Sequence, residues 1–147
     1  MQEKPDEKTN LVQGRYRTLL VIWVVILCSI VIFISMPVMI GMQRVPETNT
    51  TAFGVFAGLC LLTVVVSFVM KGILLSRAEQ QQNIALVVTA YIIAFAFCEA
   101  SCLIGLLAGF TGASPYYYLL FIPGIVCMLL HLPRRERLLA ATYKTQG

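Results

Sequence analysis

Glu99 is the residue whose type and position most directly suggest chemistry. Of the 7 acidic residues, it alone lies in the middle of a long apolar stretch, from residue 84 to residue 110. An acid at the centre of a membrane helix costs about 2.5 to 3.5 kcal/mol on insertion scales, and such acids commonly mark proton or ion sites. Its protonated form is favoured there because an unpaired charge is poorly solvated. Glu99 is therefore either a proton- or ion-binding group or a protonated acid that makes one structural hydrogen bond.

No Lys or Arg is expected within reach of Glu99. Lys71 and Arg77 belong to one end of their apolar stretch, roughly 20 Å away at about 1.5 Å per helical residue. Hydroxyl groups and backbone carbonyls of neighbouring helices are therefore the expected partners. The candidate hydroxyls are those of Ser29, Ser35, Thr63 and Ser67.

The 5 cysteines all fall within apolar stretches, at Cys28, Cys60, Cys98, Cys102 and Cys127. Cys98 and Cys102 share a helix face near Glu99, so a metal site of two thiolates and one carboxylate is conceivable. The simpler interpretation is that they are small packing residues, and we predict no metal and no cofactor. His131, the only histidine, is expected to lie at the membrane interface rather than to act as a relay or ligand. No Ser-His-Asp set, phosphate-binding loop or carboxylate pair is present, so no enzymatic activity is expected.

The composition indicates an integral membrane protein. The chain has 147 residues, of which 59% are hydrophobic and 12% are charged. A soluble domain carries about 25% charged residues, and the mean hydropathy of +0.83 agrees with this difference. Disordered, coiled-coil and disulfide-rich secreted chains are excluded, and a soluble enzyme is disfavoured.

The apolar stretches predict an all-α bundle of four transmembrane helices, since about 20 apolar residues cross a bilayer. The first stretch is longer than the apolar segment of a cleaved secretory signal, so we expect the chain to retain it. Pro37 is expected to bend or end that span. The predicted spans are residues 18–40, 52–75, 84–110 and 116–132, between a polar tail (1–17) and a basic tail (133–147).

The basic residues predict the topology. Of the 11 Lys and Arg residues, all except Arg44 fall in the two tails or at the connection between spans two and three. Because Lys and Arg accumulate on the cytoplasmic side, both termini are expected to be cytoplasmic. The connection itself, residues 76–83, is predicted to be a short polar turn. We expect a multi-pass protein of a bacterial inner or cell membrane.

Two sets of small residues predict helix-packing faces. Gly54 and Gly58 lie one turn apart in span two, and Gly105 and Gly109 repeat this spacing in span three. Such pairs allow helix backbones to approach closely in membranes. Cys102 falls on the same stripe as Gly105 and Gly109. Glu99 lies beside this stripe, among bulkier side chains that suit lipid or another subunit.

A Glu-Ala-x-x-x-x-Gly-Leu run, from Glu99 to Leu106, resembles the carboxylate helix of the proteolipid (c) subunits of rotary ATPases. The polar connection 77–82 is similar to that family's cytoplasmic loop, and the likeness covers residues 77–110. The resemblance implies that Glu99 is an ion-binding carboxylate and that Gly105 is a packing glycine. Span two lacks the family's dense glycine repeat, and the chain has two more spans than a two-helix proteolipid.

These observations lead to one functional hypothesis and two alternatives. The hypothesis is a small membrane subunit of a larger assembly, similar to a proteolipid, in which Glu99 binds and releases a proton at mid-membrane. One alternative is an accessory or scaffolding subunit with no ion role. The other is a small homo-oligomeric transporter. The expected partners are the lipid bilayer and other membrane subunits or further copies of the chain, and no nucleic acid, since no basic patch is interleaved with aromatic residues.

Overall fold

The computed structural model describes residues 5–40 and 49–140, and this part of the chain is helical with short connections. Five α-helices and one 3-10 helix follow one another along it. They are α1 (Pro5–Met39), α2 (Thr50–Gln81), α3 (Ile84–Phe110), the 3-10 helix η1 (Tyr117–Leu120), α4 (Phe121–Leu130) and α5 (Arg135–Ala140). Because a bilayer core offers no water to bond the backbone, an apolar chain there satisfies its amide groups internally, as a helix does.

Three helices are long and apolar enough to cross a membrane. The qualifying segments are Val12–Pro37, Thr50–Gln81 and Ile84–Phe110. The predicted all-helical membrane architecture is confirmed to this extent. Pro37 lies inside α1, two residues before its end at Met39.

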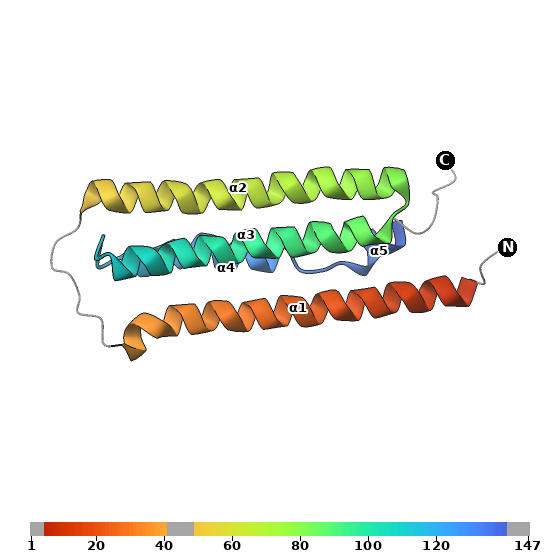
Figure 1. Ribbon diagram of the computed structural model, residues 1–147, viewed down its shortest axis with the longest axis horizontal. Helices are drawn as coiled ribbons and strands as arrows, with labels where there is room; N and C mark the ends of the chain where they lie inside the picture. Colours follow the sequence, from red (N-terminus) through yellow and green to blue (C-terminus); the bar gives the residue numbers. More distant parts are fainter. Residues whose placement is uncertain (1–4, 41–48, 141–147) are drawn as a thin grey trace.

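In the fourth predicted span, 116–132, the helical part is shorter than the apolar stretch. It forms η1 and α4, which together run from Tyr117 to Leu130. Fourteen such residues extend about 20–25 Å, less than the roughly 30 Å of a hydrocarbon core. After Leu130 the chain continues without helix as far as α5 (Figure 1). Pro133 lies in this extended piece and cannot donate a backbone hydrogen bond.

The connection between α2 and α3 is shorter than predicted. The expected polar turn 76–83 is wrong for most of its length, because α2 continues to Gln81. Ala, Arg, Glu and Gln are good helix formers, so polarity ends the membrane span without ending the helix. The turn consists of Gln82, whose backbone is left-handed (φ 49°), and Asn83, whose Oδ1 accepts a hydrogen bond from the Ala85 amide at 2.9 Å.

Helix α1 also extends beyond its predicted span. It begins at Pro5 rather than near residue 18. Proline is favoured in the first turn of a helix, where its missing amide hydrogen is not needed. The predicted span limits therefore describe where the chain becomes apolar, not where the helix starts.

Helix α3 is the centre of the molecule. It lies between α1 and α2, with α4 running along it (Figure 1). In the most apolar part of α3, 50% of the residues are buried, compared with 11% in the corresponding parts of α1 and α2. The outer faces of α1 and α2 carry exposed Val, Leu and Ile side chains. This distribution fits a chain whose outer surface contacts lipid rather than water.

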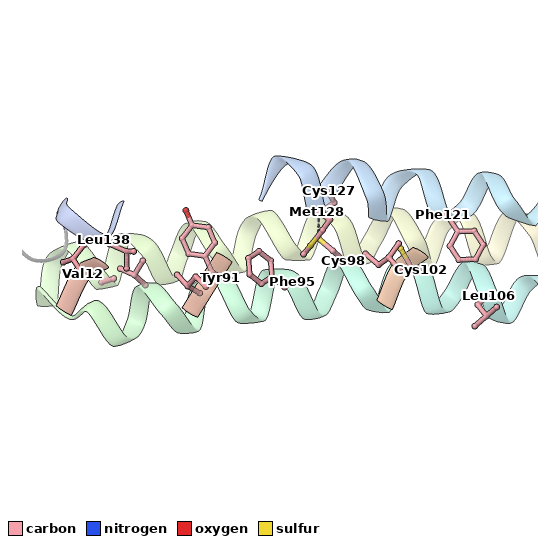
Figure 2. Packing of buried hydrophobic residues seen from close by; sticks show 14 residues of the cluster. Val12, Tyr91, Phe95, Cys98, Cys102, Leu106, Phe121, Cys127, Met128 and Leu138 are labelled. Atoms are coloured by element: carbon pink, nitrogen blue, oxygen red, sulfur yellow. Dashed lines mark hydrogen bonds between the residues drawn. The ribbon is translucent and has the colours of Figure 1, made fainter. Parts of the chain in front are cut away.

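The beginning of α1, the α2–α3 turn and α5 lie at the same end of the bundle (Figure 1). Helix α5 forms in the basic tail, and its Leu138 is buried in the same cluster as Val12 of α1 (Figure 2). Tyr91 of α3 also fixes this end. Its hydroxyl accepts a hydrogen bond from the Arg134 amide at 3.3 Å, and the Lys71 ammonium lies 4.2 Å from its ring centroid.

Candidate functional site

Glu99 lies at the contact between α1 and α3. Its carboxyl group is half-buried, and Oε1 accepts a hydrogen bond of 2.8 Å from Oγ of Ser29 on α1. Glu99 is near the middle of α3, and Ser29 lies 10 residues before the end of α1 at Met39. The expectation that a hydroxyl of a neighbouring helix bonds Glu99 is therefore confirmed for Ser29.

The chemistry of this pair accommodates either charge state of the acid. A serine hydroxyl is both a donor and an acceptor, and a carboxyl group accepts when ionised and can donate when protonated. Ser29 can thus donate to an ionised Glu99, or accept from a protonated one after rotation of the hydroxyl. The hydrogen bond between α1 and α3 is retained in both cases.

The other hydroxyls proposed as partners of Glu99 bond elsewhere. Ser35 donates to the carbonyl of Ile32 in its own helix at 2.9 Å. Thr63 likewise bonds carbonyls within α2, the shorter distance being 2.8 Å. Ser67 is buried and faces the opposite side of α3, where its Oγ lies 3.2 Å from the Ala94 carbonyl.

The small residues Gly105 and Gly109 of α3 lie against the segment that begins the fourth apolar stretch. A Cβ atom at Gly105 would lie 3.3 Å from Cβ of Leu120, and one at Gly109 would lie 2.9 Å from the ring of Tyr117. Carbon atoms normally approach to about 3.5–4.0 Å. A side chain at Gly109 would therefore displace the tyrosine ring.

Cys102 of α3 takes part in the same close contact, where it lies against Gly124 of α4. A Cβ atom at Gly124 would lie 2.5 Å from the Cys102 sulfur and 3.0 Å from the Cys98 carbonyl oxygen. The α3–α4 contact thus depends on small residues from both helices, and sequence reasoning identified only those on α3.

Gly54 and Gly58 of α2 have a different environment. Both are exposed, and nothing lies within 4 Å of a Cβ atom built at either position. Within the described part of the chain, no other helix packs against either position.

A second polar group, which the sequence did not predict, lies on the other side of α3. Ser67, Cys98, Cys127 and His131 converge there from α2, α3 and the end of α4, and all four are buried. The two sulfur atoms are 2.8 Å apart (Figure 2), and His131 Nε2 lies 2.8 Å from Ser67 Oγ and 4.0 Å from Cys127 Sγ. We call these four residues the thiol–imidazole cluster. The spacing of Cys127 and His131, four residues apart on one helix face, was the available signal.

The position of His131 corrects the sequence prediction. It was expected at the membrane interface, but it is fully buried at 0% exposure. The cause is that α4 ends at Leu130, well within the bundle, so His131 caps the helix beside α2 and packs edge-on against Phe68 at 4.5 Å between ring centroids. Its Nδ1 has no hydrogen-bond partner among the described residues.

The metal site considered from sequence, with Cys98, Cys102 and Glu99 as ligands, does not form. Glu99 faces α1, whereas Cys98 faces the thiol–imidazole cluster. Cys102 packs against Gly124 instead. The ligand atoms of Cys98, Cys127 and His131 do lie within 4.8 Å of one another, which makes this the candidate metal-ligating group of the described residues.

Comparison with known proteins returned no match to a family model, to a curated protein or to a solved structure.

Proposed function

We propose that this chain is a small integral membrane subunit in which Glu99 binds and releases a proton within the bilayer. The observation that carries the proposal is the hydrogen bond of 2.8 Å between Ser29 and Glu99, which joins α1 to the middle of α3. A carboxyl group at that depth is costly, and its presence is by default a sign of function. The resemblance of residues 77–110 to proteolipid subunits supports the same role.

The environment of Glu99 suits a reversible site. A charge sealed in the core would need a permanent partner, whereas Glu99 is only half-buried and its neighbour can serve as donor or acceptor. The exposed surface of α3 near it carries Ile92 and Leu103, at 42% and 45% exposure. A partner subunit that contacts this surface would bring its own polar group within reach of the carboxyl group and so take up or deliver the proton.

In this proposal all four apolar stretches lie in the membrane, with η1 and α4 as the fourth. The end that contains the start of α1, the α2–α3 turn and α5 faces the cytoplasm. Its support is the charge distribution, because Arg15, Arg17, Arg77, Arg134 and Arg135 all belong to this end. Arg44, the single base predicted on the other side, lies outside the described residues. The proposed location is a bacterial cell membrane.

Labelling with a hydrophobic carbodiimide tests the protonated state of Glu99 directly. The reagent partitions into the bilayer and modifies protonated carboxyl groups, so we expect a mass increase on the peptide that contains Glu99. The Glu99→Gln variant should lose this adduct. Glu136→Gln is the matched control, because Glu136 lies exposed on α5 and its removal should leave the labelling unchanged. The absence of any adduct on Glu99 between acidic and neutral pH would contradict the proposal.

Proton movement tests the role itself. We expect membranes that contain the Glu99→Gln chain to show reduced proton flux compared with membranes that contain the original chain. Ser29→Ala should leave the carbodiimide adduct on Glu99 in place, because the acid remains and only its partner is lost. Unchanged flux with Glu99→Gln, at equal protein level, would show that Glu99 has a structural role only.

The second candidate function is an accessory subunit with no ion role. The exposure of Gly54 and Gly58 favours it, because small residues exposed on a membrane helix let another helix approach. Under this function, Gly58→Leu would release a partner that co-purifies in mild detergent, and Glu99→Gln would not. The two functions therefore predict opposite outcomes for the two variants.

A further inference from the structure

We propose that the thiol–imidazole cluster is a zinc site, with Cys98, Cys127 and His131 as ligands and the Ser67 hydroxyl beside the fourth position. This site is separate from Glu99 and does not depend on the function proposed above. Three ligands of the two types favoured by zinc, two thiols and one imidazole, converge from α3 and from the end of α4.

The distances are close to those that zinc requires. Tetrahedral zinc with bonds of about 2.3 Å to sulfur and 2.0 Å to nitrogen holds two sulfurs about 3.8 Å apart and a sulfur and a nitrogen about 3.5 Å apart. Cys127 Sγ and His131 Nε2 are already 4.0 Å apart, and Ser67 Oγ lies 3.7 Å from Cys127 Sγ and 3.9 Å from Cys98 Sγ. The two sulfurs, at 2.8 Å, must separate by about 1 Å, and the Ser67 hydroxyl, at 2.8 Å from Nε2, must move aside to admit the ion. Rotation about the side-chain Cα–Cβ bonds provides both movements.

The charge balance favours a divalent metal ion. The site is buried among apolar side chains, where a net charge is strongly disfavoured. Zn²⁺ binds two thiols and a neutral imidazole by displacing one proton from each sulfur, and both protons pass to the solvent. The product, Zn²⁺ with two thiolates and one imidazole, has no net charge. A monovalent ion with the same ligands would leave one negative charge in the membrane interior.

The histidine offers Nε2 as its ligand atom. This nitrogen lies 2.8 Å from Ser67 Oγ and 4.0 Å from Cys127 Sγ. A zinc bond to Nε2 leaves the ring proton on Nδ1, which is buried without a hydrogen-bond partner among the described residues. The cost of that unsatisfied group, about 1–3 kcal/mol, is one that the metal bonds have to exceed.

Metal content of the purified full chain tests the site. The protein is reduced, separated from the reductant in mild detergent, and incubated with Zn²⁺ or with Co²⁺. We expect about one zinc per chain after removal of weakly held ions. We expect cobalt to produce the intense visible bands of a tetrahedral ion and the near-ultraviolet charge-transfer bands of thiolate ligands, with release of two protons per ion.

The variants separate this site from adventitious binding. Cys98→Ser with Cys127→Ser should abolish the cobalt bands and reduce the zinc content at least about tenfold. Cys28→Ser is the matched control, because this thiol is exposed on α1, outside the cluster, and its loss should change neither readout. Helical circular dichroism and elution volume establish that each variant is folded.

Two results would overturn the proposal. One is a zinc content of the original chain no higher than that of the double variant, with no thiolate–cobalt bands. The other is recovery of Cys98 and Cys127 as a disulfide from protein that was reduced and then incubated with zinc. If zinc is bound, both thiols should resist alkylation while the metal is present and should react once it is removed by a chelator. The cobalt bands and the disulfide assay are measured on the original chain, so they remain informative even when the double variant does not fold.

Discussion

Replacing Gly124 with alanine tests the α3–α4 contact more sharply than any other single substitution. The added Cβ atom would lie 2.5 Å from the Cys102 sulfur and 3.0 Å from the Cys98 carbonyl oxygen. The sulfur ends a short side chain and can rotate aside. The carbonyl oxygen belongs to the α3 backbone and cannot, so α4 itself has to move away from α3.

The magnitude follows from that movement. An oxygen and a carbon atom at 3.0 Å must separate by about 0.5 Å to reach ordinary contact at about 3.5 Å. Forcing one extra methyl group into a packed interior typically costs about 1–3 kcal/mol. We expect Gly124→Ala to lower the free energy of unfolding by this amount, toward the upper end because Cys127 and His131 move with α4.

The assay is unfolding in mixed detergent micelles, followed by helical circular dichroism. Gly58→Ala is the matched control, since it makes the same substitution in α2, where nothing lies within 4 Å of the new Cβ atom. Alanine is the better helix former by about 1 kcal/mol in water. The control should therefore be neutral or slightly stabilising, while Gly124→Ala destabilises.

A double-mutant cycle identifies the cause. Cys102→Ala removes the sulfur at 2.5 Å but leaves the Cys98 carbonyl oxygen at 3.0 Å. The Gly124→Ala cost should therefore be smaller in the Cys102→Ala background, by about 0.5–1.5 kcal/mol, and should not vanish. Equal stability of Gly124→Ala and Gly58→Ala would refute the packing of α4 described above, and strict additivity with Cys102→Ala would refute the assigned contact.

Two further substitutions test the contacts of α1 with the rest of the bundle. Ser29→Ala should lower the free energy of unfolding by about 1–2 kcal/mol, because it leaves the half-buried Glu99 side chain without its donor. Ser35→Ala is the control: the Ser35 hydroxyl bonds its own helix, so its loss should lower the free energy of unfolding by less than about 0.5 kcal/mol. Equal losses in the same unfolding assay would contradict the α1–α3 pairing. Trp23→Phe removes the 3.0 Å hydrogen bond from the indole to the Met128 carbonyl and should cost about 0.5–1.5 kcal/mol. Because this is the only tryptophan, its fluorescence in the original chain should shift to longer wavelength as α1 separates, and a shift that precedes loss of helix would show that α1 detaches first.

The three long apolar helices were predictable because their determinants are local. Each of the three long helices follows from an uninterrupted apolar stretch, and α3 was predicted at residues 84–110, where the structure places it. The helix ends were less predictable. Residues 76–81 are polar enough to leave the membrane yet remain helical, so hydropathy indicates the edge of the bilayer, whereas α2 ends at the left-handed Gln82.

The two candidate sites differ in how far the sequence reveals them. Glu99 was identifiable because one acid in an apolar stretch is conspicuous without any knowledge of its neighbours. The thiol–imidazole cluster was not, because Cys98 and Cys127 each have an ordinary packing explanation when considered alone. Their significance depends on α4 ending within the bundle, which brings His131 into the interior beside Ser67.

The sequence by itself determined that this chain is all-helical with three helices long and apolar enough to cross a membrane, which stretches are apolar, and which carboxyl group lies among them. These properties depend on residue type and position along one helix. Exposing backbone or charge to lipid is costly whichever helices lie alongside, so these properties hardly depend on how the helices pack. The tertiary structure alone decided which helix is central, that Ser29 rather than another hydroxyl bonds Glu99, and that two thiols and an imidazole meet. Those outcomes depend on the rotation and depth of one helix against another, which small residues such as Gly124 set through contacts between distant parts of the chain.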